Sequence, residues 1–367
     1  MQEIKRVSLS KDASILLIVT MLLICLGIVM VYSASSCNAY EDSYDSAFYL
    51  KRHLINFSVG LVLFLLVYRV NYLRIKNYTK WLLAFSVISL LVVFLPGIGH
   101  EAGGARRWIK IGPIGFQPSE LSCLCLILYL ADLLERKELF IKNILYGFMP
   151  PLVISGSIVF LVLLQPDLGT AVTLLTVSVL MMFAAGANMM YFLPFIGLVL
   201  PAFYFLIFKV PYRLRRIIGY LDPWNDAQNA GFQIIQSFLA LGSGGLLGVG
   251  LGCSRQKLFY LPQAHTDFIF SIIGEELGLV ATLSVVFLFC IFIWQGIKIS
   301  ATTKDMFGKL VAFGLTVNIG LRAIINIAVS TGAIPTKGLP LPFISYGGTA
   351  LIMNMVSVAL ILSIAKR

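Results

Sequence analysis

Residues 14–33 read SILLIVTMLLICLGIVMVYS, a run of twenty residues without a charged side chain. A helix of this length is about 30 Å long, which matches the hydrocarbon core of a bilayer. Similar runs recur along the 367 residues of the chain, of which 59% are hydrophobic and 12% are charged. A soluble domain carries about 25% charged residues, and a membrane β-barrel shows short alternating segments instead. The sequence therefore predicts an all-α polytopic membrane protein.

Hydropathy predicts ten transmembrane helices in a single domain, 1–367, with a large outer loop, 209–267, between helices 7 and 8. The predicted spans are 14–33, 54–68, 81–95, 118–134, 144–164, 168–185, 189–208, 268–295, 307–331 and 341–364. Most Lys and Arg residues of the short loops fall on the side of the N-terminus, so we expect both termini in the cytoplasm. The net charge of +11 comes from short basic clusters between apolar runs. We therefore expect membrane lipids as partners and no nucleic acid.

The composition of the predicted outer loop is not that of a disordered linker. Apolar residues from Phe232 to Leu241 have mixed helical spacing and indicate a helix in the interface or in the bundle. The glycines from Gly242 to Gly252 permit tight turns and close approach of backbones. The chain contains no GxxxxGK[ST], HExxH or CxxC motif, which argues against a nucleotide-driven pump and against a zinc or redox centre.

Ionisable side chains at membrane depth are costly, and here they gather at the outer ends of the predicted spans. The polar residues concerned are Arg106, Arg107, Lys110, Gln117, Glu120, Gln165, Asp167, His265, Thr266, Asp267, Glu275 and Glu276. Asp167 and Asp267 each precede an apolar span, so each either caps a helix or faces a polar cavity. Basic groups suit an anionic ligand such as a diphosphate, and a carboxylate among them suits proton abstraction. The residues alone leave catalysis and transport open.

Two further features lie near the C-terminus. Asn318, Arg322 and Asn326 are spaced i, i+4 and i+8 in the ninth predicted span and share one helical face. For Arg322 we expect either an ion pair with the neighbouring pair Glu275–Glu276 or contact with substrate. Residues 332–348 contain three prolines and four glycines, which excludes an ordinary helix and predicts a rigid re-entrant or cavity-lining segment.

Six motifs follow one another along nearly the whole chain. They are GARRWI (104–109), QPSE (117–120), QPDLGT (165–170), GFQ with Gln236 and Ser237 (231–237), AHTDFIF (264–270) and LPFISYGG (341–348). With ten predicted spans and a large outer loop, this set resembles the SEDS proteins (shape, elongation, division and sporulation). PTKG (335–338) and DPW (222–224) are more similar to the division branch of that family, FtsW, than to the elongation branch, RodA.

The resemblance implies a RodA-like fold and a peptidoglycan glycosyltransferase that polymerises lipid II at the bacterial cytoplasmic (inner) membrane, at the division septum. Asp267 matches the family's essential loop aspartate, the general base that deprotonates the acceptor sugar. The implied substrate-binding residues are Arg106, Arg107, Lys110, Gln117, Glu120, Asp167, His265, Thr266, Lys337 and Ser345. The resemblance also implies a divalent cation (Mg or Mn), a class B penicillin-binding protein transpeptidase as partner, and contacts with other divisome proteins.

Two positions depart from the family pattern. Members usually carry Lys three residues after the Glu of QPSE and Glu before AHTD, where this chain has Cys123 and Gln263. Each departure removes a charge from the implied site, and Arg322 or Lys110 could replace it. Two other functions stay open at this level: a lipid II flippase, and a non-catalytic scaffold for a transpeptidase, which the loss of lysine at position 123 favours.

Overall fold

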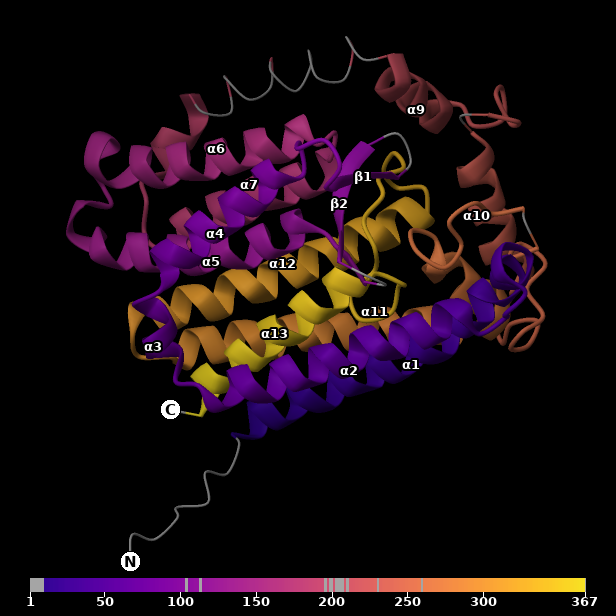
Figure 1. The fold of residues 1–367 in the computed structure, drawn as a ribbon, viewed down its shortest axis with the longest axis horizontal. Helices are drawn as coiled ribbons and strands as arrows, with labels where there is room; N and C mark the ends of the chain where they lie inside the picture. Colours follow the sequence, from indigo (N-terminus) through magenta and orange to yellow (C-terminus); the bar gives the residue numbers. More distant parts are fainter. Residues whose placement is uncertain are drawn as a thin grey trace, which may run out of the picture.

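The computed structural model describes residues 10–102, 105–111, 114–194, 211–229, 231–258 and 260–366, with the single residues 197, 201 and 208. Its helices are α1 (Lys11–Ser43), α2 (Phe48–Arg69), α3 (Tyr72–Lys76), α4 (Thr79–Val92), α5 (Pro118–Arg136), η1 (Glu138–Phe140), η2 (Ile144–Phe148), α6 (Met149–Leu164), α7 (Leu168–Ala184), η3 (Met189–Tyr191), α9 (Pro211–Leu221), α10 (Phe232–Ser243), α11 (Ile269–Thr302), α12 (Met306–Ser330) and α13 (Gly348–Ala365). Its strands are β1 (Gly99–Ala102), β2 (Ala105–Ile111) and β3 (Ile114–Phe116). The long helices run roughly along one axis, with the strands, α9 and α10 toward one end (Figure 1).

The predicted spans are borne out as helices over most of the described chain. Six helices are long and apolar enough to cross a membrane: α1, α2, η2 with α6, α11, α12 and α13. The spans predicted at 81–95 and 168–185 correspond to the shorter apolar helices α4 and α7, and the span at 118–134 corresponds to α5. The span at 189–208 falls largely outside the described residues, so the count of ten stays a prediction.

The all-α prediction missed a small antiparallel sheet between α4 and α5. Its order is β1-β2-β3, and Ile109 of β2 pairs with Gly99 on one side and Phe116 on the other. The strands have three to seven residues, which is too short for alternation to stand out in a hydropathy profile. This sheet carries Arg106, Arg107 and Lys110, which the sequence analysis places in a loop.

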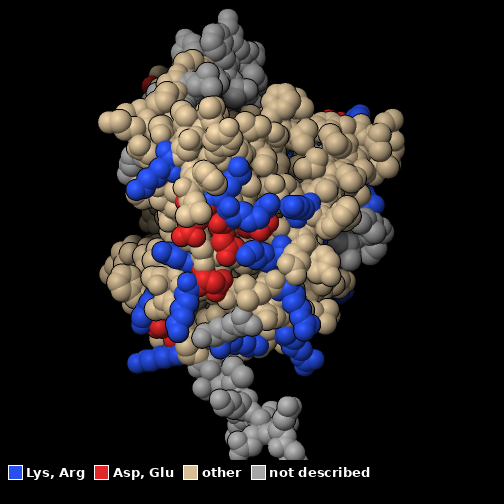
Figure 2. Space-filling view, turned by 90° about the vertical axis from the view of Figure 1, so that its left-hand side faces the viewer, with Lys and Arg blue, Asp and Glu red and all other residues tan. Residues whose placement is uncertain are grey.

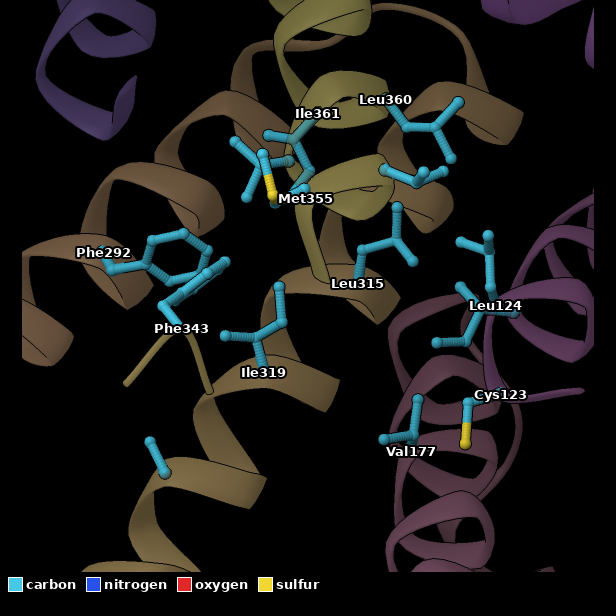
Figure 3. Close-up of a cluster of buried hydrophobic side chains, with 14 of the residues drawn as sticks. Cys123, Leu124, Val177, Phe292, Leu315, Ile319, Phe343, Met355, Leu360 and Ile361 are labelled. Carbon is cyan, nitrogen blue, oxygen red and sulfur yellow. The ribbon is translucent and has the colours of Figure 1, made fainter. Parts of the chain in front are cut away.

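The tenth predicted span begins too early. α13 begins at Gly348, and residues 341–347 have irregular backbone. Pro340 and Pro342 cannot donate the amide hydrogen bonds of a helix. Leu341, Phe343 and Ile344 of this segment are nevertheless buried. Phe343 lies 5.7 Å from Phe292 of α11, measured between ring centroids, in the apolar core (Figure 3).

The two ends of the described chain lie at the same end of the bundle. Lys366 donates to the carbonyl of Tyr68 at the end of α2 (3.0 Å), and Lys298 pairs with Asp12 at the start of α1 (2.8 Å). Figure 2 shows this end with many Lys and Arg side chains around a smaller acidic patch. An excess of Lys and Arg in short loops is typical of the cytoplasmic side of a membrane protein.

Helix α11 is interrupted two turns after its start, and the glycine-rich part of the outer loop fills the interruption. Gly278 has φ +77°, which breaks the helical hydrogen-bond ladder. Backbone groups of residues 245–250 replace the missing partners. The bonds run from Val249 N to Glu275 O (2.9 Å), from Gly250 N to Glu276 O (3.0 Å), from Leu279 N to Gly245 O (2.9 Å) and from Val280 N to Leu246 O (3.3 Å). The glycines therefore serve the close backbone approach that the sequence predicts.

Substituting Gly248 tests this packing. Its φ is +82°, and a Cβ atom there would overlap the carbonyl of Glu276. We expect Gly248→Ala to lower the free energy of unfolding by at least about 1–3 kcal/mol, since strain and a backbone clash act together. Gly242→Ala is the matched control, because a Cβ atom there meets no atom within 4 Å. Equal melting temperatures of the two variants in detergent would contradict the packing.

Candidate functional site

Asp267 lies at the end of a tight turn that precedes α11. The amides of Thr266 and Asp267 both donate to the carbonyl of Gln263 (3.1 Å each), and Gln263 has φ +58°. Thr266 also donates its hydroxyl to the Gln263 side-chain oxygen (2.9 Å). A glutamine oxygen accepts this bond as a carboxylate would, so the departure at Gln263 preserves the turn.

The turn is fastened to the irregular segment before α13. Tyr346 N donates to the carbonyl of His265 (2.9 Å), and the Ser345 hydroxyl donates to the carbonyl of Thr266 (2.5 Å). A Cβ atom on Gly338 would lie 3.1 Å from Oδ2 of Asp267, so this glycine brings the two segments together. Residues 263–267 and 338–346 thus form one unit, which we call the aspartate platform.

Asn326 of α12 anchors the platform from below. Its side-chain amide donates to the carbonyls of Asp267 and Leu339, both at 2.8 Å. Asn326 is 1% exposed, so water does not compete for these two hydrogen bonds. They therefore hold the backbone at Asp267 and Leu339 firmly in place. Helical spacing places Asn326 on a polar face but does not predict this role, because its two acceptors are backbone atoms that no motif reveals.

Aromatic side chains cover one side of the platform. The His265 ring lies 4.7 Å from that of Tyr49 of α2 and 5.8 Å from that of Tyr346, measured between centroids. His265 is buried, whereas Asp267 is partly exposed. The histidine therefore helps to hold the turn, and Asp267 keeps partial access to solvent.

Lys337 is a cation directly beside the platform. It lies one residue before Gly338 and is partly buried, and burial lowers the pKa of its ammonium below the ordinary value. Within the described part of the chain, no carboxylate oxygen lies within ion-pair distance of Lys337. A partly desolvated cation without an acidic partner is suited to an anionic ligand.

A second group of candidate residues surrounds the start of α7. Asp167 caps this helix by accepting from the amide and hydroxyl of Thr170 (3.1 and 2.9 Å), and Gln117 approaches it at 3.5 Å. The capping interpretation of Asp167 is therefore confirmed, and the residue is only 4% exposed. Arg107 donates to the carbonyls of Gln165 and Pro166, so it braces the turn that carries Asp167.

The other two basic residues of the sheet remain accessible. Arg106 is exposed and lies 3.7 Å from the exposed carboxylate of Glu101, a geometry worth little energy in water. Lys110 is also exposed. The aspartate platform and the residues around Asp167 lie close to each other. A Cβ atom on Gly169 of α7 would lie only 3.0 Å from the side chain of Leu339 in the platform.

Arg322 has a different partner from the one that we expected. It donates from Nη1 to Glu120 of α5 (2.5 Å) and from Nη2 to the sulfur of Cys123 (3.1 Å), and all three side chains are buried. The expected ion pair with Glu275 or Glu276 was wrong, because those glutamates bind the outer loop instead. The guanidinium occupies the space beside position 123, and the thiol borders the apolar core near Val177 (Figure 3).

Arg322 thus places a positive charge against residue 123, where the resemblance implies a lysine. Cys123 shares a helical face with Glu120, as its spacing predicts, and both contact the same guanidinium. Arg322 and Asn326 are one turn apart on α12, so a single helix supports both groups of candidate residues.

No three His, Cys, Asp or Glu side chains in the described residues come together as a metal site. The divalent cation that the resemblance implies therefore stays a prediction.

Comparisons with known proteins place the chain in a family. The model of the FtsW, RodA and SpoVE group, described as "Cell cycle protein", matches residues 13–367. The chain belongs to this family. It is 43% identical over 367 residues to the probable peptidoglycan glycosyltransferase FtsW of Geobacter metallireducens, covering 100% of this chain and 96% of that protein. It is 41% identical over 353 residues to stage V sporulation protein E of Bacillus subtilis, covering 96% of each.

Solved structures agree with the FtsW/RodA/SpoVE assignment. A chain from a structure described as the structural coordination of polymerization and crosslinking by a peptidoglycan synthase complex matches with a TM-score of 0.76 and 28% identity, covering 95% of this chain and 96% of that one. The rod shape determining protein RodA of Thermus thermophilus matches with a TM-score of 0.70 and 26% identity, covering 95% of each chain. The expected RodA-like fold is thereby confirmed.

Measurements of stability can test whether a cation at position 322 takes the place of one at position 123. Arg322→Gln leaves Glu120 buried without a cation, and we expect it to lower the free energy of unfolding by about 3–5 kcal/mol. Adding Cys123→Lys to this variant should restore most of the loss, because an ammonium one turn from Glu120 can pair with it. Adding Cys123→Met, similar in length but uncharged, should not. Thermal unfolding of the four proteins checks this, and equal stability of the two double variants would refute the exchange.

Proposed function

We propose that this protein is a peptidoglycan glycosyltransferase that polymerises lipid II, with Asp267 as general base. The observation that carries the proposal is the aspartate platform, in which hydrogen bonds from α12 and from the segment before α13 fix the backbone around a partly exposed carboxylate. The names of relatives and the family assignment support the reaction class. The geometry supports the choice of residue.

The proposed step is a displacement at the anomeric carbon of the donor sugar. The Asp267 carboxylate takes the proton of the acceptor 4-hydroxyl while that oxygen forms the new glycosidic bond. The bond between the anomeric carbon and the diphosphate breaks, and undecaprenyl diphosphate leaves with the electron pair. A platform whose backbone is hydrogen-bonded on both sides keeps the base in place without paying for its ordering during the reaction.

Accessible cations suit the leaving diphosphate. Lys337 lies next to the platform and has no acidic partner among the described residues, and Arg106 and Lys110 are exposed on β2. Arg107 differs, because its guanidinium already binds two carbonyls and therefore positions the turn before α7. The proposed step does not depend on a divalent cation.

The protein is a multi-pass membrane protein, and we propose that both termini face the cytoplasm of a bacterial inner membrane. The basic end in Figure 2 supports this orientation. A structural relative from a peptidoglycan synthase complex supports a class B penicillin-binding protein as partner. Septal location and contacts with other divisome proteins follow from the similarity to FtsW proteins.

The scaffold alternative rests on the missing lysine at position 123. Arg322 brings a cation to this place, but it is paired with Glu120, so this alternative stays open. The flippase alternative requires polar groups along a path between both faces, whereas the platform and the residues around Asp167 lie at one end of the bundle.

Asp267→Asn tests the general base. The amide keeps the size of the side chain but cannot accept a proton, so we expect polymerisation of labelled lipid II to fall at least about 10²-fold. Melting temperature should stay close to that of the wild type. Asp45→Asn, which removes an exposed carboxylate paired with Lys51, is the control and should keep full activity. Glycan synthesis at a normal rate by the Asp267 variant would exclude this residue as the base.

If the Lys337 ammonium binds the diphosphate, substrate binding should depend on pH. Burial lowers its pKa, and only the protonated form attracts a diphosphate, so affinity should fall as pH rises through that lowered value. Arginine stays charged in this range, so Lys337→Arg should move the loss of affinity to higher pH. The measurement is KM for lipid II from about pH 7 to pH 10, with Lys51→Arg as control. A Lys337→Arg profile identical to that of the wild type argues against a role of this charge in binding.

A further inference from the structure

Among the buried ionisable groups outside the aspartate platform, three lie together beside the outer loop and have no part in the proposed reaction. They are Lys257 of the outer loop and the adjacent Glu275 and Glu276 of α11, which are 5%, 2% and 0% exposed. Charges this deeply buried are retained only where they are fully paired, so their contacts indicate what they do.

Glu275 binds the backbone of the outer loop. Its carboxylate accepts from the amide of Arg255 (2.9 Å), from the amide of Gln256 (3.4 Å) and from the hydroxyl of Ser254. A single carboxylate therefore holds three successive residues of the loop. Bonds to a charged acceptor are stronger than those between neutral groups, so this contact defines the path of the chain here.

Glu276 binds the same loop through a side chain and joins it to α1. Its carboxylate pairs with the Lys257 ammonium (2.9 Å) and accepts from the hydroxyl of Ser33 (2.6 and 2.8 Å). Lys257 also donates to the Ser33 hydroxyl (3.2 Å). The outer loop, α1 and α11 therefore meet at one buried ion pair.

These contacts close a chain segment that contains Asp267. Lys257 and Glu276 are 19 residues apart in sequence, and Ser254 and Glu275 are 21 apart. Asp267 lies between them, directly before α11. Closing the segment at its base restricts the conformations of everything within it. The break at Gly278 adds backbone bonds from residues 249 and 250 to the same two glutamates.

We propose that Glu275, Glu276 and Lys257 are positioning residues for glycosyl transfer: they fasten the outer loop to α11 and α1 and thereby fix the place of the Asp267 carboxylate. This inference rests on the proposed function. We call the contacts of Glu275, Glu276 and Lys257 with the outer loop and α1 the clamp. The platform bonds hold Asp267 from the side of α12 and α13, and the clamp holds it from the side of α1 and α11. Both are required, because a reacting group displaced by about 1 Å can lose about 10²-fold in rate.

Glu275→Gln tests the clamp with the least damage to the fold, because it leaves no buried cation behind. Both oxygens of the Glu275 carboxylate accept from loop donors. Glutamine replaces one oxygen by an NH2 group, which is itself a donor and cannot accept these bonds, so the loop must shift. We expect kcat for lipid II polymerisation to fall about 10- to 100-fold, while KM changes less than about twofold because substrate contacts are kept. Glu41→Gln is the matched control, since this carboxylate is exposed at the outer end of α1.

Trypsin cleavage after Arg255 gives a readout that does not depend on activity. In the wild type, the Arg255 and Gln256 amides are both bonded to Glu275, so the bond between these residues should resist cleavage in the folded protein. In Glu275→Gln it should be cut at least several-fold faster, at an unchanged melting temperature. If wild-type protein does not polymerise lipid II, the proposed function fails, but faster cleavage would still show that the clamp holds the loop.

A double variant covers the case in which Glu275→Gln does not fold. Lys257→Met with Glu276→Gln removes both charges together, so no unpaired charge remains in the interior. We again expect a lower kcat, an unchanged KM and faster cleavage after Arg255. Lys257→Arg, which keeps the charge, should retain most of the activity. Wild-type kcat in a folded Glu275→Gln or double variant, with cleavage as slow as in the control, would overturn the proposal.

Discussion

Irregular backbone can persist in an apolar helix bundle only where its amides and carbonyls find partners inside the protein, and this constraint organises the functional end of the molecule. In the platform, the side-chain amide of Asn326 donates to two backbone carbonyls, and the hydroxyl of Ser345 donates to a third. The broken turn of α11 meets the same constraint with the backbone of residues 245–250. Each solution joins segments that are distant in sequence, so satisfying the backbone also builds the site.

Buried charges add a second set of connections. The pair Arg322–Glu120 joins α12 to α5, and the pair Lys257–Glu276 joins the outer loop to α11 and, through Ser33, to α1. Such pairs cost desolvation energy and contribute little net stability compared with apolar packing, but removing one partner is severe. Their value here is in the geometry that they impose. They set the relative positions of the segments that carry the candidate catalytic carboxylate and the residues around Asp167.

Exposure separates the charges that hold the protein together from those available to a ligand. Arg322 and Lys257 are buried in ion pairs with Glu120 and Glu276, and Arg107 is occupied by two carbonyls. Lys337, Arg106 and Lys110 keep access to solvent, as does the Asp267 carboxylate. A lipid-linked diphosphate requires cations that are not already neutralised, so a chain with many basic residues offers few for recognition.

The sequence by itself determined the helical membrane architecture, because runs of about 20 apolar residues have one physical interpretation. It also determined the shared polar face of Asn318, Arg322 and Asn326 and the concentration of polar groups at one end, which follow from helical periodicity. The prolines and glycines of residues 332–348 also predicted the irregular segment that ends where α13 begins at Gly348, although hydropathy alone placed the start of this span too early. The sequence could not reveal the three short strands, which depend on local backbone geometry. Only the tertiary structure decided that Arg322 pairs with Glu120 and that Glu275 and Glu276 hold the outer loop. Several helices present acidic groups at similar depth, and the choice among them depends on how the helices pack.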